Sequence, residues 1–353
     1  MSLPEPIDAP CAWHGRDMGV SDKWVRTLSA KEIAEIDRAL KAVERRGLAW
    51  HDIGAADFPV PGLAPLIEEI RTELEDGFGL IKLRGLPVER YSLDQLRKLY
   101  FGLGCNVGTP VHQNRSGELM RLIRDEGGDV GAKYGKIDGA TMAGGQTFLS
   151  SYARTLTNGA LRFHTDRTDT VTLLCVNQAA EGGVSTISSS VSVMNEMMRR
   201  RPDLAALLFE PIFRSRHGEE ADSANDIYPL PVFGIRDGRF TSHFSLTYIE
   251  AAQTVDGVPK LTEQQWEAIH MLLDLAKELA FEMVLEPGDI QFLNSHVTYH
   301  GRTPFKDAPS GDRQRLLMRL WLSMPNSRPL PQDHAVLWRQ VQAGAIRGGI
   351  GPG

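Results

Sequence analysis

His164 and Asp166 stand two positions apart in a β-like run at 161–166. On a strand, residues i and i+2 project from the same face, so an imidazole and a carboxylate would lie side by side as ligands of one metal ion. A His-x-Asp match also arises often by chance, and the alternative is a surface histidine beside a turn aspartate. The pair therefore indicates a metal site only when a third ligand joins it.

Two downstream histidines can supply that third ligand. A Pro-Gly-Asp turn at 287–289 leads into an apolar strand, and His296 and His300 follow it. Two histidines and a carboxylate that hold one face of a metal and leave the other open are typical of non-haem Fe(II) oxygenases. Catalytic zinc can use the same ligand types, but its helical HExxH signature is absent. Ligand chemistry alone leaves His296 and His300 as alternatives.

The segment 315–323 alternates between apolar and polar residues, as a strand with two different faces does. Its even positions from 316 to 322 are all apolar, whereas Arg315, Arg319 and Ser323 occupy odd positions. A buried guanidinium is costly unless it meets an anion, and its planar fork fits a carboxylate; the alternative is an edge strand with its arginines in water. Because Arg315 and Arg319 would lie about 13 Å apart on a regular strand, we expect them to have different partners.

The elements that position these residues change in character along the chain. Capping boxes followed by apolar residues at helical spacing predict helices that begin near Ser29, Ser92 and Thr262. Beyond residue 105, short β-like runs alternate with turn-forming clusters. The clearest runs are 119–124, 162–177, 289–294 and 315–323. Helices ahead of many short strands predict a mainly β sandwich or barrel buttressed by helices.

We expect a single structural domain with three parts. Residues 1–79 would form a helical segment packed on the core, 80–325 the catalytic core, and 326–353 a loosely packed C-terminal tail. The glycine-rich stretch 127–145 reads as a loop that is a candidate lid over the site.

Composition and charge exclude several classes of protein. Among the 353 residues, 42% are hydrophobic and 24% are charged, as in ordinary globular proteins. The formal charge of −6 and the lack of a basic cluster argue against a nucleic-acid partner. We expect no membrane association, since no apolar run has the length of a span and no secretory signal is visible. Three widely spaced cysteines favour a reduced, cytoplasmic setting.

The order of these motifs resembles the taurine dioxygenase-like (TauD/TfdA-type) family of Fe(II)/2-oxoglutarate-dependent oxygenases. The motifs are His-Thr-Asp, Gly-Gly with a following Ser or Thr, Pro-Gly-Asp with an Asn and a distal His, and Arg-x-x-x-Arg, over roughly residues 80–323. The combination is specific, although each motif alone is not. The resemblance implies a double-stranded β-helix (jelly-roll) core with N-terminal and inserted helices.

The resemblance also implies metal ligands. His164, Asp166 and His300 match the iron ligands of the family, and His300 is preferred over His296 because the stretch that begins at Asn294 reproduces the pattern Asn-x-x-Val-Thr-x-His. Because halogenating relatives have a small residue in place of this aspartate, Asp166 favours hydroxylation or another oxidation such as desaturation.

Cosubstrate residues follow from the same resemblance. Arg315 matches the arginine that binds the far carboxylate of 2-oxoglutarate, and Arg319 matches a position that reaches an anionic substrate in some members. The family's Gly-Gly-Asp-Thr is replaced here by Gly-Gly-Val-Ser-Thr, so Ser185 and Thr186 are alternatives for the hydroxyl that holds the cosubstrate.

The implied activity is oxidation of a small organic molecule by Fe(II), 2-oxoglutarate and O2, with release of succinate and CO2. Homo-oligomerisation is left open. Two alternatives come from other classes: a zinc-dependent hydrolase with the same ligands, and a non-catalytic jelly-roll that binds a small molecule. Weaker candidates for the substrate pocket are Arg319, His296, Tyr299, Tyr152 and Asn294.

Overall fold

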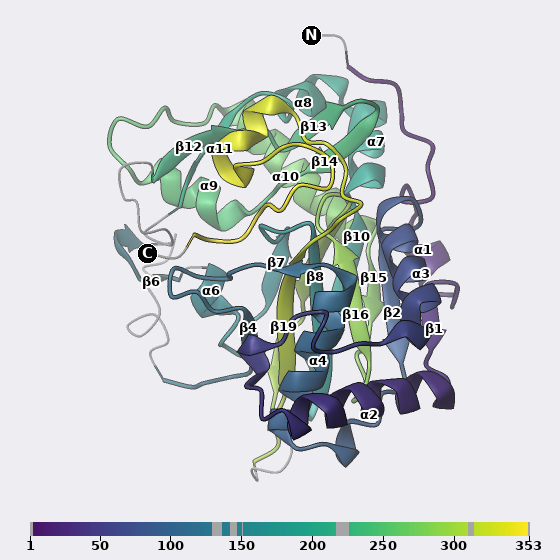
Figure 1. The fold of residues 1–353 in the computed structure, drawn as a ribbon. Coiled ribbons are helices and arrows are strands. Elements are labelled where there is room, and N and C mark those ends of the chain that lie inside the picture. The colour runs from purple at the N-terminus through teal and green to yellow at the C-terminus, as the bar shows by residue number, and fades with distance from the viewer. Residues whose placement is uncertain are drawn as a thin grey trace.

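Two facing β-sheets form the centre of the molecule, and helices cover their outer faces (Figure 1). The computed structural model describes residues 3–128, 136–141, 147–149, 151–216, 226–309 and 314–351. Side chains are described throughout this part except at 136–141, 147–149 and 151–152.

The larger sheet has the strand order β1-β2-β16-β8-β19-β3, with β4 also paired to β19. Its strands are β1 (Val25–Thr27), β2 (Leu80–Arg84), β3 (Thr109–Pro110), β4 (Met120–Ile123), β8 (Thr170–Asn177), β16 (Ile290–Asn294) and β19 (Leu316–Ser323). β1 and β2 run parallel, and the other neighbours are antiparallel. β19 has the predicted period of two, but it begins at Leu316, so Arg315 lies just before the strand.

The smaller sheet has the order β15-β10-β17-β7, with every pairing antiparallel. Its strands are β7 (Leu161–His164), β10 (Ser185–Ser189), β15 (Phe281–Met283) and β17 (Thr298–Arg302). The described residues add four two-stranded pairs, namely β5 (Lys136–Thr141) with β6 (Thr147–Leu149), β9 (Glu181–Gly182) with β18 (Phe305–Lys306), β11 (Ile212–Ser215) with β12 (Ile227–Leu230), and β13 (Phe233–Arg236) with β14 (Arg239–Ser242).

Apolar side chains from both sheets meet between them. Leu317 and Trp321 of β19 and Val171 of β8 come from the larger sheet, and Ile187 of β10 and Met283 of β15 come from the smaller one. Because side chains alternate along a strand, the residues next to these point outward to the helices. The interior of the sandwich is therefore lined by the odd-numbered positions of β19, which include Arg319.

Helices α2 (Ala30–Arg45), α3 (Ala64–Glu75) and α4 (Leu93–Val107) pack on the outer face of the larger sheet. Capping boxes begin α2 at Ser29 and α4 at Ser92, as predicted. Gly104 lets α4 approach β19 closely, because a Cβ there would lie 2.6 Å from Leu320 Cδ1. This layer buries the even-numbered side chains of β19.

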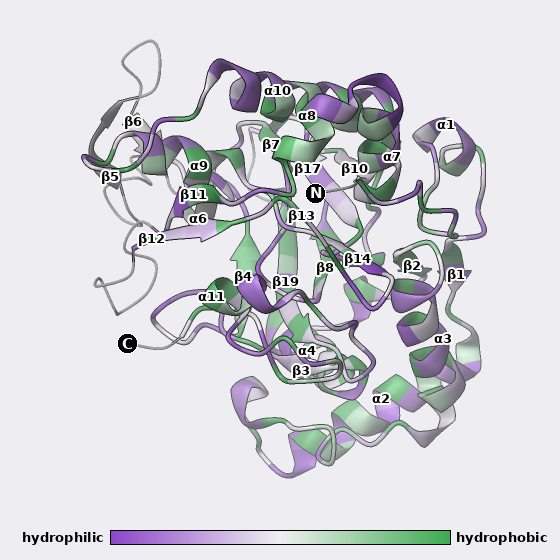
Figure 2. Cartoon of the chain, turned by 90° about the horizontal axis from the view of Figure 1, so that it is seen from above, coloured by the Kyte–Doolittle hydropathy of each residue, from purple (hydrophilic) through white to green (hydrophobic). Residues whose placement is uncertain are grey.

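A second group of helices packs on the outer face of the smaller sheet around Val297 and Tyr299. It consists of α7 (Ser190–Arg200), α8 (Pro202–Leu207), α9 (Leu246–Gln253) and α10 (Glu263–Glu278). Seen from above, α7, α8 and α10 lie along one edge of the molecule and α2 and α3 along another, with the strands between them (Figure 2). The shorter helices are α1 (Gly15–Met18), α6 (Ser151–Arg154) and α11 (Ala335–Trp338). Among the described residues, no helix combines the length and hydropathy that crossing a bilayer requires.

Three expectations from the sequence need correction. The run 162–177 is two strands, β7 and β8, because the chain crosses from the smaller sheet to the larger one between them. The C-terminal tail is not loosely packed: α11 and buried residues such as Arg347 and Ile350 belong to it. The stretch 127–145 contains β5, and its residues 129–135 and 142–145 lie outside the described part of the chain.

Candidate metal centre

His164 and Asp166 reach the same place from two different local structures. His164 is the last residue of β7, whereas Asp166 lies in the loop 165–169 that follows. The prediction that both sit on one strand is therefore wrong for Asp166. The backbone N–H of Thr165 donates to the Phe244 carbonyl at 2.8 Å, which turns the chain out of the smaller sheet directly after His164. The turn still directs the carboxylate toward the imidazole.

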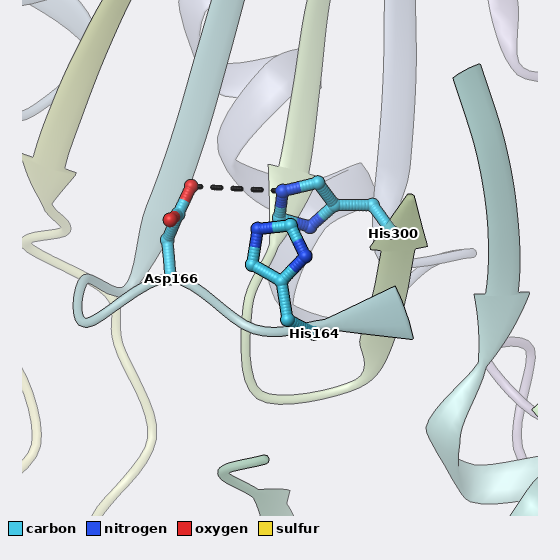
Figure 3. Close-up of side chains that lie close together, drawn as sticks. All are labelled: His164, Asp166 and His300. Carbon is cyan, nitrogen blue, oxygen red and sulfur yellow. Dashed lines mark ion pairs between the residues drawn. The ribbon is translucent and has the colours of Figure 1, made fainter. Parts of the chain in front are cut away.

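His300 lies on β17 directly opposite His164 on β7, and the two ring centroids are 4.3 Å apart. Each of His164, Asp166 and His300 has a ligand-type atom within 4.8 Å of those of the other two. Their side chains point toward one another, and the dashed line in Figure 3 joins Asp166 to His300. Of the two histidines that ligand chemistry left open, His300 is the one that joins His164 and Asp166 in a cluster able to hold a metal.

The protonation states of these groups suit a divalent metal. Nδ1–H of His164 donates to the Arg162 carbonyl at 2.8 Å, because a carbonyl can only accept, and this leaves Nε2 for a metal. Burial lowers the pKa of His300 to about 3, so its imidazole is neutral at pH 7. Burial alone would raise the pKa of Asp166, but the positive charge of Arg319 opposes it, and the net shift is downward. At neutral pH the set therefore offers a neutral imidazole at His300 and a carboxylate at Asp166.

Two buried atoms of this set have no hydrogen-bond partner. They are Oδ2 of Asp166 and Nδ1 of His300, and the closest described contact between these side chains is 3.6 Å, from His300 Nε2 to Asp166 Oδ2. Leaving a buried carboxylate oxygen unpaired is costly, so such atoms in native proteins usually have a ligand or water as partner. A metal ion between Asp166 Oδ2 and the facing Nε2 of His300 would satisfy the carboxylate oxygen, and the donor set fits Fe(II).

Arg319 faces the interior of the sandwich and contacts Asp166. Its Nη1 lies 3.6 Å from Asp166 Oδ1, its Nε–H donates to Gln113 Oε1 at 2.7 Å, and its guanidinium stacks over Trp321 at 4.9 Å from the ring centroid. The arginine therefore engages Oδ1 and leaves Oδ2 to face the histidines. The Gln113 side-chain amide also donates to the Arg319 carbonyl at 2.9 Å, so Gln113 contacts both the backbone and the guanidinium of Arg319.

Arg315 has different neighbours from Arg319, as expected from their separation of four residues along the chain. Its guanidinium lies 5.1 Å from the Phe305 ring centroid, and its Nη1 is buried without a partner. Burial lowers the pKa of Arg315 to about 10, so the side chain remains a cation at neutral pH. Gly183 makes room for it, because a Cβ there would lie 2.9 Å from Arg315 Nε. An unpaired buried cation of this kind suits a carboxylate ligand.

The register of the smaller sheet separates Ser185 from Thr186. Ser185 and Ile187 share one face of β10, and Ile187 pairs with His300 and belongs to the core between the sheets. Thr186 pairs with Gly301 and so lies on the opposite, outer face. Ser185 therefore points to the same side of the sheet as His300, and Thr186 does not.

The weaker candidates for a substrate pocket lie elsewhere or have other partners. His296 is fully buried, with Nδ1 bonded to Thr241 at 2.8 Å and Nε2 to Asp169 at 2.9 Å. The Tyr299 hydroxyl pairs with Ser242 Oγ at 2.6 Å on the outer face of β17. Asn294 donates to the Leu74 carbonyl and accepts from the His296 backbone. The side chain of Tyr152 lies outside the described part of the structure.

Sequence reasoning missed Arg302 and Gln113. Arg302 follows His300 by two positions on β17, so period two alone places it on the ligand face. Gln113 carries no such signal, because it lies in a turn after β3 and meets Arg319 across 206 residues of sequence.

A family model described as "Taurine catabolism dioxygenase TauD, TfdA family" matches residues 44–321, which is most of the chain. Among curated proteins, FR-33289 synthase of Streptomyces rubellomurinus (strain ATCC 31215) is 29% identical over 337 residues, which cover 93% of this chain and 94% of that protein.

Solved structures have the same fold at lower identity. Asparagine oxygenase in complex with Fe(II), 2S,3S-3-hydroxyasparagine and succinate has a TM-score of 0.61 at 17% identity and covers 92% of this chain and 100% of that one. The non-heme iron oxygenase OrfP in complex with Fe and alpha-ketoglutaric acid has a TM-score of 0.59 at 16% identity, covering 85% and 94%. The predicted jelly-roll fold is thereby confirmed.

Proposed function

We propose that this chain, which belongs to the taurine catabolism dioxygenase TauD, TfdA family, is an Fe(II)- and 2-oxoglutarate-dependent dioxygenase that hydroxylates a small organic molecule. The observation that carries the proposal is the convergence of His164, Asp166 and His300 within 4.8 Å. The family match favours an oxygenase over a zinc-dependent hydrolase or a non-catalytic binding protein. The bound iron would supply dioxygen activation and C–H oxidation, coupled to decarboxylation of 2-oxoglutarate to succinate.

The protein's own contribution is to hold and shield the metal. His164 and His300 would coordinate as neutral imidazoles and Asp166 as a carboxylate, which leaves the opposite face of the metal for ligands. The bond from His164 to the Arg162 carbonyl would fix the orientation of one imidazole, and Arg319 would fix the orientation of the carboxylate. Asp166 is buried and both histidines are half-buried, which would limit the access of bulk water to the metal.

The cosubstrate would lie between Arg315 and the metal ligands. Arg315 is a buried cation that forms no ion pair with a carboxylate of the described residues, and Ser185 projects from the ligand face of β10. These placements support Arg315 over Arg319 for the far carboxylate of 2-oxoglutarate, because Arg319 already contacts Asp166 and Gln113. They support Ser185 over Thr186 for the hydroxyl.

The substrate class is taken from relatives. An asparagine oxygenase binds a hydroxylated asparagine, and OrfP binds hydroxylated arginine, so an amino acid or similar polar molecule is the first class to screen. Asp166, which halogenating relatives lack, supports hydroxylation as the outcome. A cytoplasmic location, homo-oligomerisation and the boundaries at 79/80 and 325/326 stay predictions.

Replacing Asp166 by alanine tests the proposal directly. We expect the wild-type protein, titrated anaerobically with Fe(II) and 2-oxoglutarate, to develop the absorption band of the metal–cosubstrate chelate. We expect Asp166→Ala to lose this band and substrate-dependent succinate formation, because it removes the only charged ligand of the set. Metal analysis after anaerobic purification, with Fe(II) and Zn(II) offered together, identifies the bound ion.

The matched control is Asp274→Ala, an exposed aspartate on α10. It should titrate like the wild type. A wild-type protein that binds Zn(II) but no 2-oxoglutarate would favour the hydrolase, and normal turnover in Asp166→Ala would exclude the ligand role of Asp166.

A further inference from the structure

Arg302 is a buried arginine that forms no ion pair within the part of the chain that the structure describes. It is 5% exposed, and its Nε and Nη1 atoms have no hydrogen-bond partner. Its Nη2 donates to the carbonyls of Thr157, at 2.7 Å, and of Gly159. No carboxylate of the described residues forms an ion pair with it. Two of the three guanidinium nitrogens therefore remain available in the interior.

Arg302 and Arg315 lie against the same aromatic ring. Their guanidinium carbons are 4.8 Å and 5.1 Å from the centroid of Phe305, and Arg315 is 4% exposed with an unpartnered Nη1. Stacking on an aromatic face offsets only part of the cost of burying a cation. Two buried guanidinium groups that contact one ring, with three nitrogens that have no partner among the described residues, call for an anion.

The strand register places this pair at the proposed cosubstrate site. Arg302 stands directly opposite Ser185 on β10, on the face that carries His300. Arg315 lies over Gly183, two residues before Ser185 on the same chain segment. Both arginines are therefore placed at the start of β10, two residues along that strand from Ile187, which pairs with His300.

We propose that Arg302 is a second arginine that binds the far carboxylate of 2-oxoglutarate, together with Arg315. This inference rests on the proposed function and adds a residue to its cosubstrate site. Nε and Nη1 of Arg302 would donate to the carboxylate, while Nη2 keeps its bonds to the turn at 157–159. Since that turn leads into β7, the bound cosubstrate would be linked to the strand that carries His164.

The alternative is that Arg302 only holds the turn at 157–159. The two roles differ in which ligand they affect. An arginine that binds the far carboxylate discriminates 2-oxoglutarate from 2-oxopentanoate, which has a methyl group in place of that carboxylate. An arginine that only supports the turn affects both 2-oxo acids alike.

The experiment compares wild type, Arg302→Met, Arg302→Gln and Arg302→Lys as anaerobic Fe(II) proteins. Dissociation constants for 2-oxoglutarate and 2-oxopentanoate are measured from the chelate absorption band and by calorimetry, without turnover. We expect Arg302→Met and Arg302→Gln to weaken 2-oxoglutarate ~10- to 100-fold, the loss of one charge-assisted contact. Arg302→Lys should lose less, and binding of 2-oxopentanoate should not change. Arg199→Met, on the exposed side of α7, is the control.

Equal weakening of both 2-oxo acids, or an unchanged constant for 2-oxoglutarate, would overturn the proposal. If Arg302→Met does not fold, Arg302→Gln decides the matter, because its amide can still donate to the turn carbonyls. A wild-type protein that binds neither 2-oxo acid would contradict the proposed function itself, which separates that failure from the failure of the Arg302 role.

Discussion

At the scale of single residues, two histidines four positions apart have opposite roles. His300 has an unpartnered nitrogen and faces His164, whereas both nitrogens of His296 are bonded, to Thr241 and Asp169. Burial lowers the pKa of His296 to about 4, so it is neutral and donates Nε2–H to the Asp169 carboxylate. His296, with both nitrogens bonded, stabilises the fold, whereas Nε2 of His300 faces Asp166 at 3.6 Å, beyond hydrogen-bond distance, and can bind a metal.

The buried His296 predicts a loss of stability in acid. Between its ordinary pKa near 6.5 and its folded value near 4, the unfolded chain binds a proton that the folded chain does not. Stability should therefore fall as the pH drops from about 6.5 to about 4, and the lowered pKa of Asp169 acts in the same direction at lower pH. The slope of unfolding free energy against pH reports how many more protons the unfolded chain binds than the folded one. In His296→Gln, this number should fall by up to about one.

Urea denaturation of the metal-free protein at several pH values measures this slope. His51→Gln, an exposed histidine, should keep the wild-type slope. Identical slopes in wild type and His296→Gln would contradict the account.

At the scale of elements, the loop 165–169 joins the two sheets and carries Asp166, and the C-terminal segment holds it. The Gly349 backbone N–H donates to the Arg167 carbonyl at 2.7 Å, and Arg347 Nε–H donates to Asp169 Oδ1 at 2.7 Å. Gly348 has φ +76°, and a Cβ there would lie 2.9 Å from the Arg167 carbonyl oxygen. In Figure 1 this segment, in yellow, returns from β19 past the upper end of the sheets.

Loosening this contact should weaken metal binding. Arg347→Met removes the bond to Asp169, three residues after Asp166, and we expect a lower melting temperature and ~10-fold weaker Fe(II) binding, as for other groups that orient metal ligands. Anaerobic Fe(II) titration and thermal unfolding measure the two effects. The neighbouring Ile346→Ala, at a position 67% exposed, should change neither. Unchanged Fe(II) affinity in Arg347→Met would show that the tail does not position the loop.

At the scale of the whole molecule, the larger sheet separates a stabilising layer from the site. Even-numbered residues of β19 pack on α4, and odd-numbered residues face the metal ligands. Stability and chemistry therefore depend on opposite faces of one strand.

Leu320→Ala tests this separation. Leu320 is fully buried beside Gly104 of α4, so its truncation should cost about 2–5 kcal/mol of unfolding free energy. Fe(II) affinity of the folded protein should stay unchanged, because the side chain points away from Arg319 and Asp166. Leu93→Ala, at a position 39% exposed, is the control for denaturation and metal titration. A folded Leu320→Ala protein with weakened Fe(II) binding would contradict the separation.

The sequence by itself determined the ligand types, the capped helices and the two-faced character of 315–323, because capping and alternation depend on residues a few positions apart. The resemblance in motif order also predicted the family and the jelly-roll fold. Only the tertiary structure decided that Asp166 lies in a crossover loop, that Ser185 rather than Thr186 faces inward, and that Arg302 stands opposite Ser185. It also decided that the C-terminal segment packs on the Asp166 loop. These facts depend on which strands pair and in which register. Such contacts join residues more than a hundred positions apart, so a pattern within a short stretch of sequence cannot predict them.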